Sequence, residues 1–131
     1  MYSRNAALAQ YKKIDHESAI EGAGPHRLIQ MLMQGGIERM EQSRRAFEAG
    51  NIEQKGLLLG KAISIIAGLQ ASLDHDQGGE IATNLDSLYD YMQRALLEAN
   101  INNDMNKIEE VSGLLSTIKS SWDAIDPAIS H

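Results

Sequence analysis

Apolar residues recur at alternating steps of three and four over most of the chain, which is the period of an amphipathic α-helix. The first segment of this kind begins at Pro25 and continues to Gly50-Asn51, where the glycine predicts the end of a helix. A second segment follows and ends before Asp74–Gly79, whose polar and glycine composition predicts a loop. The apolar stripes of these two segments comprise Ile29, Met33, Met40 and Phe47, and then Leu59, Ala62, Ile66, Leu69 and Leu73.

Two further segments in the C-terminal half show the same spacing. The third ends at a polar break over residues 100–103, and the fourth ends at Asp126-Pro127, because proline cannot continue a helix. Their stripes comprise Ile81, Leu85, Leu88, Met92, Ala95 and Ala99, and then Ile108, Val111, Leu115, Ile118 and Trp122. Four amphipathic helices with short connections predict an all-α fold, an antiparallel four-helix bundle over residues 25–126 with a tail at 127–131.

The segment before the bundle has a different pattern. Residues 1–24 contain a narrow apolar stripe of Leu8, Tyr11 and Ile14, which is too short to hold a helix without tertiary contacts. Gly22-Ala23-Gly24 then gives the backbone the freedom of a hinge. We therefore expect a short N-terminal helical arm that docks on the bundle and can be displaced by a partner. The alternative is a fixed helix that completes the core.

Apolar residues also lie beside the main stripes, and they are the main indication of a binding function. These additional residues are Leu28, Leu32, Leu58, Ile63, Ile65, Tyr89 and Leu114. One interpretation is that they widen the core face of each helix. The other is that they line an apolar groove for a helical segment of a partner. Tyr89 lies one position off its stripe, so we expect it to face such a groove with its polar tip outward.

Composition and charge narrow the class of protein. The 131 residues suit a single domain, and the absence of cysteine excludes disulfides, thiolate metal sites and a cysteine nucleophile. The formal net charge is −6, and residues 51–131 hold five basic against twelve acidic residues, so no basic face for nucleic acid or anionic lipid is expected. No apolar run reaches the ~18 residues of a membrane span, and no secretory signal is evident. We expect a cytoplasmic protein without membrane insertion.

Motifs for catalysis, cofactors or metals are missing from the sequence. Asp74–Gly79 resembles the start of a calcium loop, but Gly78 stands at the fifth ligand position and Leu85 at the closing one, so no metal is expected. A four-helix bundle can also serve as a histidine phosphotransfer module. His26 and His75 would be its candidate acceptors, although neither lies in the middle of an exposed helical face. We therefore expect a non-enzyme without a cofactor.

The residues around the third segment carry a family resemblance. Together with supporting positions elsewhere, the chain resembles the FliS family of flagellar secretion chaperones over nearly its whole length. The most specific stretch comprises Leu73-Asp74, Gly78-Gly79-Glu80-Ile81-Ala82, Asn84-Leu85, Leu88-Tyr89-Asp90-Tyr91-Met92 and Ala99-Asn100. Supporting positions are Tyr11, Pro25, Leu28-Ile29, Met31-Leu32, Lys61-Ala62, Ile65-Ile66, Leu69, Val111, Leu114-Leu115 and Trp122.

The resemblance implies a function and a partner. FliS-like proteins bind the C-terminal segment of flagellin, which stops premature polymerisation and keeps flagellin competent for type III export. The resemblance further implies contact with the flagellar export gate. Combining it with the apolar pattern, we expect the partner-binding residues to be Leu8, Tyr11, Ile14, Leu28, Leu32, Met33, Ile63, Leu85, Tyr89 and Met92.

Two other classes remain open from the sequence. One is the histidine phosphotransfer bundle, which phosphorylation of the histidines would reveal. The other is a structural helical module that associates with itself through the additional apolar residues, which light scattering would reveal.

Overall fold

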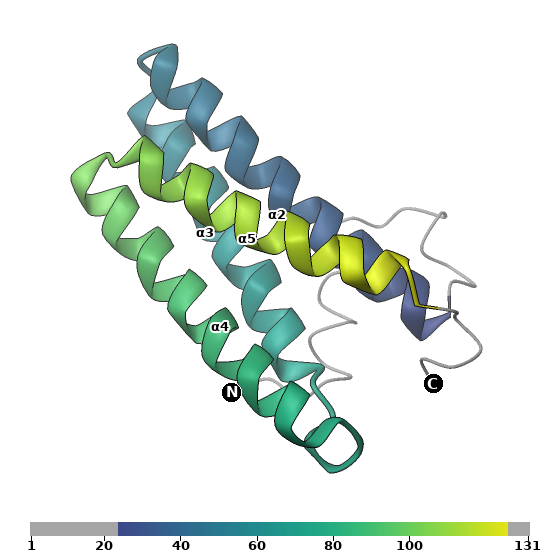
Figure 1. Ribbon diagram of the computed structural model, residues 1–131. Helices are drawn as coiled ribbons and strands as arrows, with labels where there is room; N and C mark the ends of the chain where they lie inside the picture. Colours follow the sequence, from purple (N-terminus) through teal and green to yellow (C-terminus); the bar gives the residue numbers. More distant parts are fainter. Residues whose placement is uncertain (1–23, 126–131) are drawn as a thin grey trace.

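The computed structural model describes residues 24–125, and four helices occupy that range (Figure 1). They are α2 (Pro25–Glu48), α3 (Ile52–Ala71), α4 (His75–Asn102) and α5 (Met105–Asp123). Helix α2 packs against α3 and α5, and α4 packs against the same two helices, so α2 and α4 lie diagonally opposite each other. The predicted antiparallel four-helix bundle is confirmed. The predicted arm, with Leu8, Tyr11 and Ile14, lies outside the described residues.

The helix ends follow the predicted signals at most positions. Pro25 is the first residue of α2, where its missing N–H costs no hydrogen bond, and Gly24 is the N-cap. Gly50 has a φ of 81°, a left-handed conformation that suits glycine and ends α2. The side chain of Asn51 then accepts a hydrogen bond from the backbone N–H of Gln54 and caps α3.

The start of α4 differs from the prediction of a loop over Asp74–Gly79. Asp74 is the N-cap, with its side chain accepting from the backbone N–H groups of Asp76 and Gln77, so the helix already begins at His75. The helix is kinked at Gly79, where φ is 51° and ψ is −124°. A Cβ atom at Gly78 would lie 2.9 Å from the Cβ of Ala82. The two glycines therefore permit a kinked helical start in place of the predicted loop.

The core contains most residues of the predicted stripes and most of the additional apolar residues. Of the latter, Leu28, Leu32, Leu58, Ile65 and Tyr89 are buried. Each helix of the bundle contacts two neighbours, so its core face is wider than one stripe. The first interpretation, that the additional residues widen the core faces, is therefore confirmed for these five. Within the described range, none of the helices combines the length and apolarity needed to span a bilayer.

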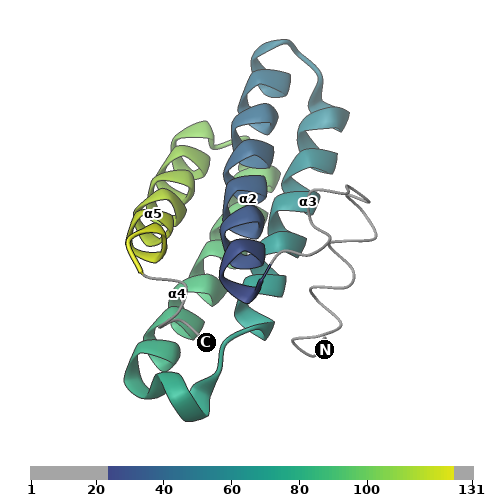
Figure 2. The ribbon, with the colours of Figure 1, turned by 90° about the vertical axis from the view of Figure 1, so that its right-hand side faces the viewer.

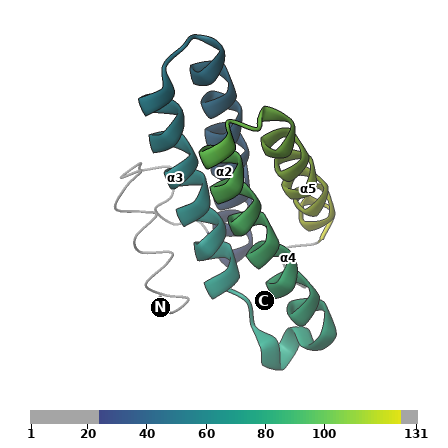
Figure 3. The same ribbon diagram turned by 90° about the vertical axis from the view of Figure 1, so that its left-hand side faces the viewer.

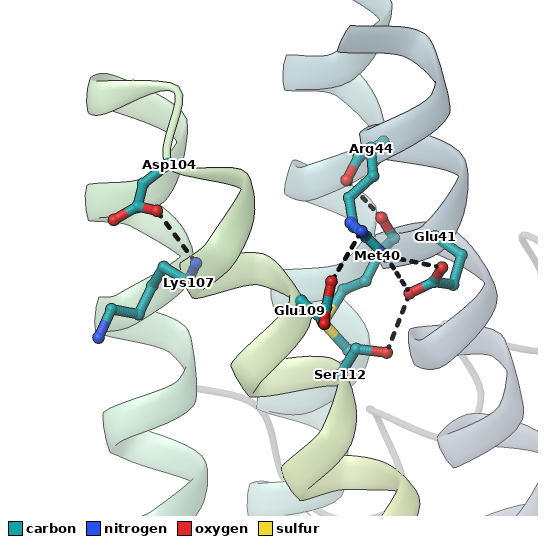
Figure 4. Close-up of polar contacts among 8 residues, drawn as sticks. Met40, Glu41, Arg44, Asp104, Lys107, Glu109 and Ser112 are labelled. Atoms are coloured by element: carbon teal, nitrogen blue, oxygen red, sulfur yellow. Dashed lines mark hydrogen bonds and ion pairs between the residues drawn. The ribbon is translucent and has the colours of Figure 1, made fainter. Parts of the chain in front are cut away.

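Polar contacts join α2 to α5 along one side of the bundle (Figure 4). The guanidinium of Arg44 lies between two carboxylates, donating to Glu41 at 3.1 Å and to Glu109 at 2.8 Å. Ser112 donates to the same Glu41 from α5 at 3.4 Å. At the other end of these helices the indole N–H of Trp122 donates to the backbone carbonyl of His26 at 3.0 Å. Contacts at both ends thus fix α5 on α2.

The buried ammonium of Lys55 joins α3 to the end of α4. Its Nζ donates to the carbonyl oxygen of Asn100 at 3.0 Å and to the side-chain oxygen of Asn103. It also lies 5.9 Å from the ring centre of Phe47 on α2. A positive charge at the C-terminal end of α4 is favourable, because the unpaired carbonyls there carry partial negative charge.

Candidate partner-binding surface

The packing between α4 and α5 is the least extensive of the four neighbouring helix pairs. Its polar contacts centre on Glu110, which accepts from the hydroxyl of Tyr91 at 2.9 Å and from Nζ of Lys107 at 3.0 Å. The hydrogen bonds from Lys107 and Tyr91 lower the pKa of Glu110, and the bond to Glu110 raises the pKa of Lys107. Glu110 is exposed, and Tyr91 and Lys107 are only half-buried. Water therefore screens these contacts, and they orient the helices more than they stabilise the pair.

Apolar side chains continue beyond these polar contacts toward the start of α4. Leu88 lies one turn before Tyr91, and Leu114 lies one turn after Glu110, so both occupy the sides on which the two helices meet. Both are only half-buried. Together with their neighbours along the helices they form the α4–α5 face, which comprises Ile81, Leu85, Leu88, Leu114 and Ile118.

Ile81 is the most informative member of this face. It stands four residues before Leu85 on the core-facing stripe of α4, yet it is 71% exposed. The prediction that Ile81 is part of the core is therefore wrong. The first turns of α4 project beyond the ends of α2 and α5 (Figures 2 and 3), and α5 diverges from α4 toward that end (Figure 1). The apolar stripe of α4 thus continues past the helices that would cover it.

The sequence-predicted binding residues occupy different layers of the structure. Leu32, Met33, Tyr89 and Met92 belong to the core cluster and are at most 2% exposed, and Leu28 is also buried. The expectation that Tyr89 faces an open groove is therefore wrong. Desolvation of its hydroxyl raises the pKa of Tyr89 to about 12. A binding role for these core residues stays a prediction.

Two of the predicted residues remain accessible at the edge of the core. Leu85 and Ile63 are half-buried and pack against the core cluster. Leu85 belongs to the α4–α5 face, whereas Ile63 lies on α3. From the sequence, the other members of the α4–α5 face were assigned to core stripes or to the additional residues. The sequence signal for the exposed turn of α4 is Gly78-Gly79, which stands just before Ile81.

A second set of exposed aliphatic residues lies on the outer side of α3 and α4. They are Ile52 and Leu57 on α3 and Leu97 and Ile101 on α4, each of which is at least half exposed. The two helices are adjacent there, since a Cβ atom at Gly56 would lie 3.7 Å from the side chain of Asn100. Exposed apolar side chains are therefore present on α3 and α4 outside the α4–α5 face as well.

The two described candidate histidines have different surroundings. His26 is buried and its ring stacks on that of Trp122, with 4.8 Å between ring centres. A buried, stacked imidazole is a poor phosphoryl acceptor. His75 is exposed at the start of α4, 3.9 Å from a carboxylate oxygen of Asp86. In the part of the chain that the structure describes, no cluster of three or more acidic or histidine side chains could hold a metal ion.

Comparison with known proteins decides the family. A family model described as flagellar protein FliS matches residues 7–129. The chain belongs to the FliS family. It is 52% identical over 125 residues to the flagellar secretion chaperone FliSB of Pseudomonas aeruginosa, and this match covers 95% of this chain and 98% of that protein. These findings support the function of a flagellar export chaperone.

Two further relatives carry the same description. The flagellar secretion chaperone FliS of Salmonella typhimurium is 49% identical over 131 residues, covering 99% of this chain and 96% of that protein. The flagellar secretion chaperone FliS of Vibrio cholerae is 45% identical over 121 residues, covering 92% of this chain and 89% of that protein. The resemblance inferred from the sequence is confirmed by these matches.

Proposed function

We propose that this FliS-family chain binds the C-terminal segment of flagellin in the cytoplasm, where it prevents premature polymerisation and keeps flagellin competent for type III export. The relatives are named as flagellar secretion chaperones, and such a protein needs a client. Delivery of that client implies contact with the export gate, which we propose as a further partner. The chain acts by stoichiometric binding and not by catalysis.

The observation that carries this proposal is the uncovered end of the α4 stripe. Ile81 faces the side of α4 that elsewhere forms the core, and half-buried Leu85, Leu88, Leu114 and Ile118 continue that surface toward the bundle. An amphipathic helix laid on this face would complete the core packing that α5 leaves unfinished. A helix that docks on such a surface uses apolar residues at steps of three and four.

The energetics fit a client segment that orders on binding. Full burial of an exposed Ile or Leu side chain contributes about 1.5–3 kcal/mol, so covering Ile81 and four half-buried side chains contributes several kcal/mol. Ordering a disordered segment costs about 2–5 kcal/mol or more of that gain. The net binding therefore depends on covering the whole face, which favours a long amphipathic segment over a short peptide.

The deeper residues predicted from the sequence have a supporting role in this proposal. Met92 and Tyr89 lie beneath the surface of α4, and Leu32 and Met33 lie on α2 across the core. We assign direct contact to Leu85 and support of the binding surface to these four. The predicted contribution of the arm residues 1–16 lies outside the described structure, and deletion of that segment tests it.

A matched pair of α4 variants tests the proposal. Ile81 and Ile101 are both isoleucines of α4, and their exposed fractions are similar, 71% and 78%. Only Ile81 belongs to the α4–α5 face. Polymerisation of purified flagellin would be followed by light scattering with increasing amounts of the chain. We expect the native chain and Ile101→Gln to suppress polymerisation at equimolar amounts, and Ile81→Gln to require a several-fold excess.

The same experiment can contradict the proposal. Unchanged polymerisation at a twofold excess of the native chain would show that it does not hold flagellin in the monomeric form. Equal suppression by Ile81→Gln and the native chain would show that the α4–α5 face is not the binding surface. Both substitutions replace exposed side chains, so their melting temperatures should match that of the native chain.

A further inference from the structure

A single side-chain hydrogen bond joins α4 to α5 in the part of the chain that the structure describes. It is the bond that the hydroxyl of Tyr91 donates to the carboxylate of Glu110 at 2.9 Å. Helix α5 is held more firmly by its other neighbour, because Glu109 and Trp122 bond to α2 near opposite ends of α5. The position of α5 relative to α2 therefore does not depend on Tyr91.

Helix α4 is held by α3 in the same way. The side chain of Gln70 donates to a carboxylate oxygen of Asp86 at 2.6 Å, and the ammonium of Lys55 donates to the carbonyl oxygen of Asn100 at 3.0 Å. The bundle thus consists of two tied pairs, α2 with α5 and α3 with α4. Extensive packing between α2 and α3 joins the pairs on one side. On the other side, the bond between α4 and α5 is the tie that sets their separation.

This bond lies at the inner end of the α4–α5 face. Leu88 is one turn before Tyr91 on α4, and Leu114 is one turn after Glu110 on α5, so the apolar face begins directly beside the bond. Beyond the bond, α5 diverges from α4 toward the end where Ile81 is exposed (Figure 1). The separation at the bond therefore sets the distance between the apolar rows of the two helices.

The chemistry of the bond suits a fixed separation. A hydroxyl that donates to a carboxylate makes a charge-assisted hydrogen bond, which is shorter and stronger than a bond between neutral groups. Lys107 donates to the other carboxylate oxygen of Glu110 at 3.0 Å and so restricts its rotation. The hydrogen bonds from Lys107 and Tyr91 lower the pKa of Glu110, so the carboxylate stays ionised near neutral pH. The ring of Tyr91 is half-buried and rigid.

We propose that Tyr91 is a positioning residue of the flagellin surface, because its bond to Glu110 holds α4 and α5 at the separation that the client helix requires. This inference rests on the proposed function, since it assigns a role within the surface that binds flagellin. A client helix must contact the apolar rows of both helices at once, and a surface fixed in advance saves the cost of ordering it on binding. Loss of the hydroxyl should therefore lower affinity although every apolar residue of the face remains.

The separation can be measured on the free chain without flagellin. The chain has no cysteine, so Ser87→Cys on α4 and Ser121→Cys on α5 provide unique sites for spin labels. Both serines are exposed and lie beyond the bond, toward the open end of the face. Double electron–electron resonance should give a narrow distance distribution, and Tyr91→Phe in the labelled chain should broaden it. An unchanged distribution would overturn the proposal, whether or not the chain binds flagellin.

Calorimetric titration with flagellin gives the second test. Tyr91→Phe should weaken binding roughly three- to tenfold, the equivalent of one net hydrogen bond. Glu110→Ala should weaken it equally, whereas Glu110→Gln keeps an acceptor oxygen and should retain most of the affinity. The control is Asp90→Ala, which removes a carboxylate beside Tyr91 that pairs with Arg94 in its own helix, and it should bind as the native chain does.

The outcomes separate this role from the proposed function. Native affinity of Tyr91→Phe, or an equal loss in Asp90→Ala, would overturn the role of Tyr91. Absence of binding by the native chain would contradict the proposed function instead, and the spin-label distances would still show whether Tyr91 fixes the two helices. These side chains are at least partly exposed, so thermal unfolding of each variant should stay close to that of the native chain.

Discussion

Replacement of Gly79 by alanine tests whether the kink at the start of α4 depends on glycine. Gly79 has a φ of 51° and a ψ of −124°, and a Cβ atom there would meet nothing within 4 Å. The cost of alanine is therefore backbone strain and not a steric clash with another residue. Strain at such positions is about 1–3 kcal/mol, and the lower entropy of the unfolded alanine chain offsets about 0.4–1 kcal/mol of it. We expect a net loss of about 1–2 kcal/mol.

The matched control is Gly113→Ala on α5. A Cβ atom at Gly113 also meets nothing within 4 Å, but Gly113 lies inside a regular helix, so alanine should stabilise the chain by about 0.5–1 kcal/mol. Urea unfolding monitored by circular dichroism measures both free energies of unfolding. We expect the two variants to deviate from the native chain in opposite directions. Equal stability of Gly79→Ala and Gly113→Ala would refute the assignment of a glycine-dependent kink.

Three further predictions concern the core, the end of the bundle and the complex. The pKa of Tyr89 is raised from 10.0 to about 12, so the folded state binds the phenolic proton more tightly than the unfolded state does. The free energy of unfolding should therefore fall by about 2–3 kcal/mol as the pH rises from 10 to 12. Tyr89→Phe should remove that part of the loss when urea unfolding is measured across this pH range. Lys55→Met removes a buried ammonium group together with the two hydrogen bonds that it donates, and it should lower the free energy of unfolding by about 1.5–3 kcal/mol. The control Lys61→Met on the surface should change that free energy by less than about 0.5 kcal/mol in the same thermal and urea unfolding experiments. Affinity for flagellin should change less than about tenfold between about 0.1 and 1 M salt in fluorescence titrations, because apolar burial drives the binding; a steep loss would indicate ion pairing instead.

The fold could be predicted from the sequence because apolar spacing and helix-end residues act locally. The steps of three and four defined the helices, and Pro25 and Gly50 stand at the start and end of α2 as predicted. The start of α4 was missed because a turn with Asp74 as cap and Gly79 in a positive-φ conformation has the composition of a loop. Local composition does not reveal which backbone conformation each glycine adopts.

The candidate surface could be predicted only in part, because exposure depends on where neighbouring helices end. The stripe position of Ile81 is the same as that of Leu85 or Met92, yet Ile81 is 71% exposed. The first turns of α4 project beyond α2 and α5 (Figures 2 and 3). Tyr89 shows the converse, since a position beside the stripe is buried where a second helix packs against it. Sequence spacing gives the direction of a side chain on its helix but not the length of the helices around it.

We propose above that the chain binds flagellin through the C-terminal segment of flagellin. Isothermal titration calorimetry of the native chain against full-length flagellin, and against flagellin lacking that segment, measures this most directly. We expect one chain bound per full-length flagellin, with a negative heat-capacity change from apolar burial, and no measurable binding to the truncated form. Equal affinity for the two forms of flagellin would contradict it.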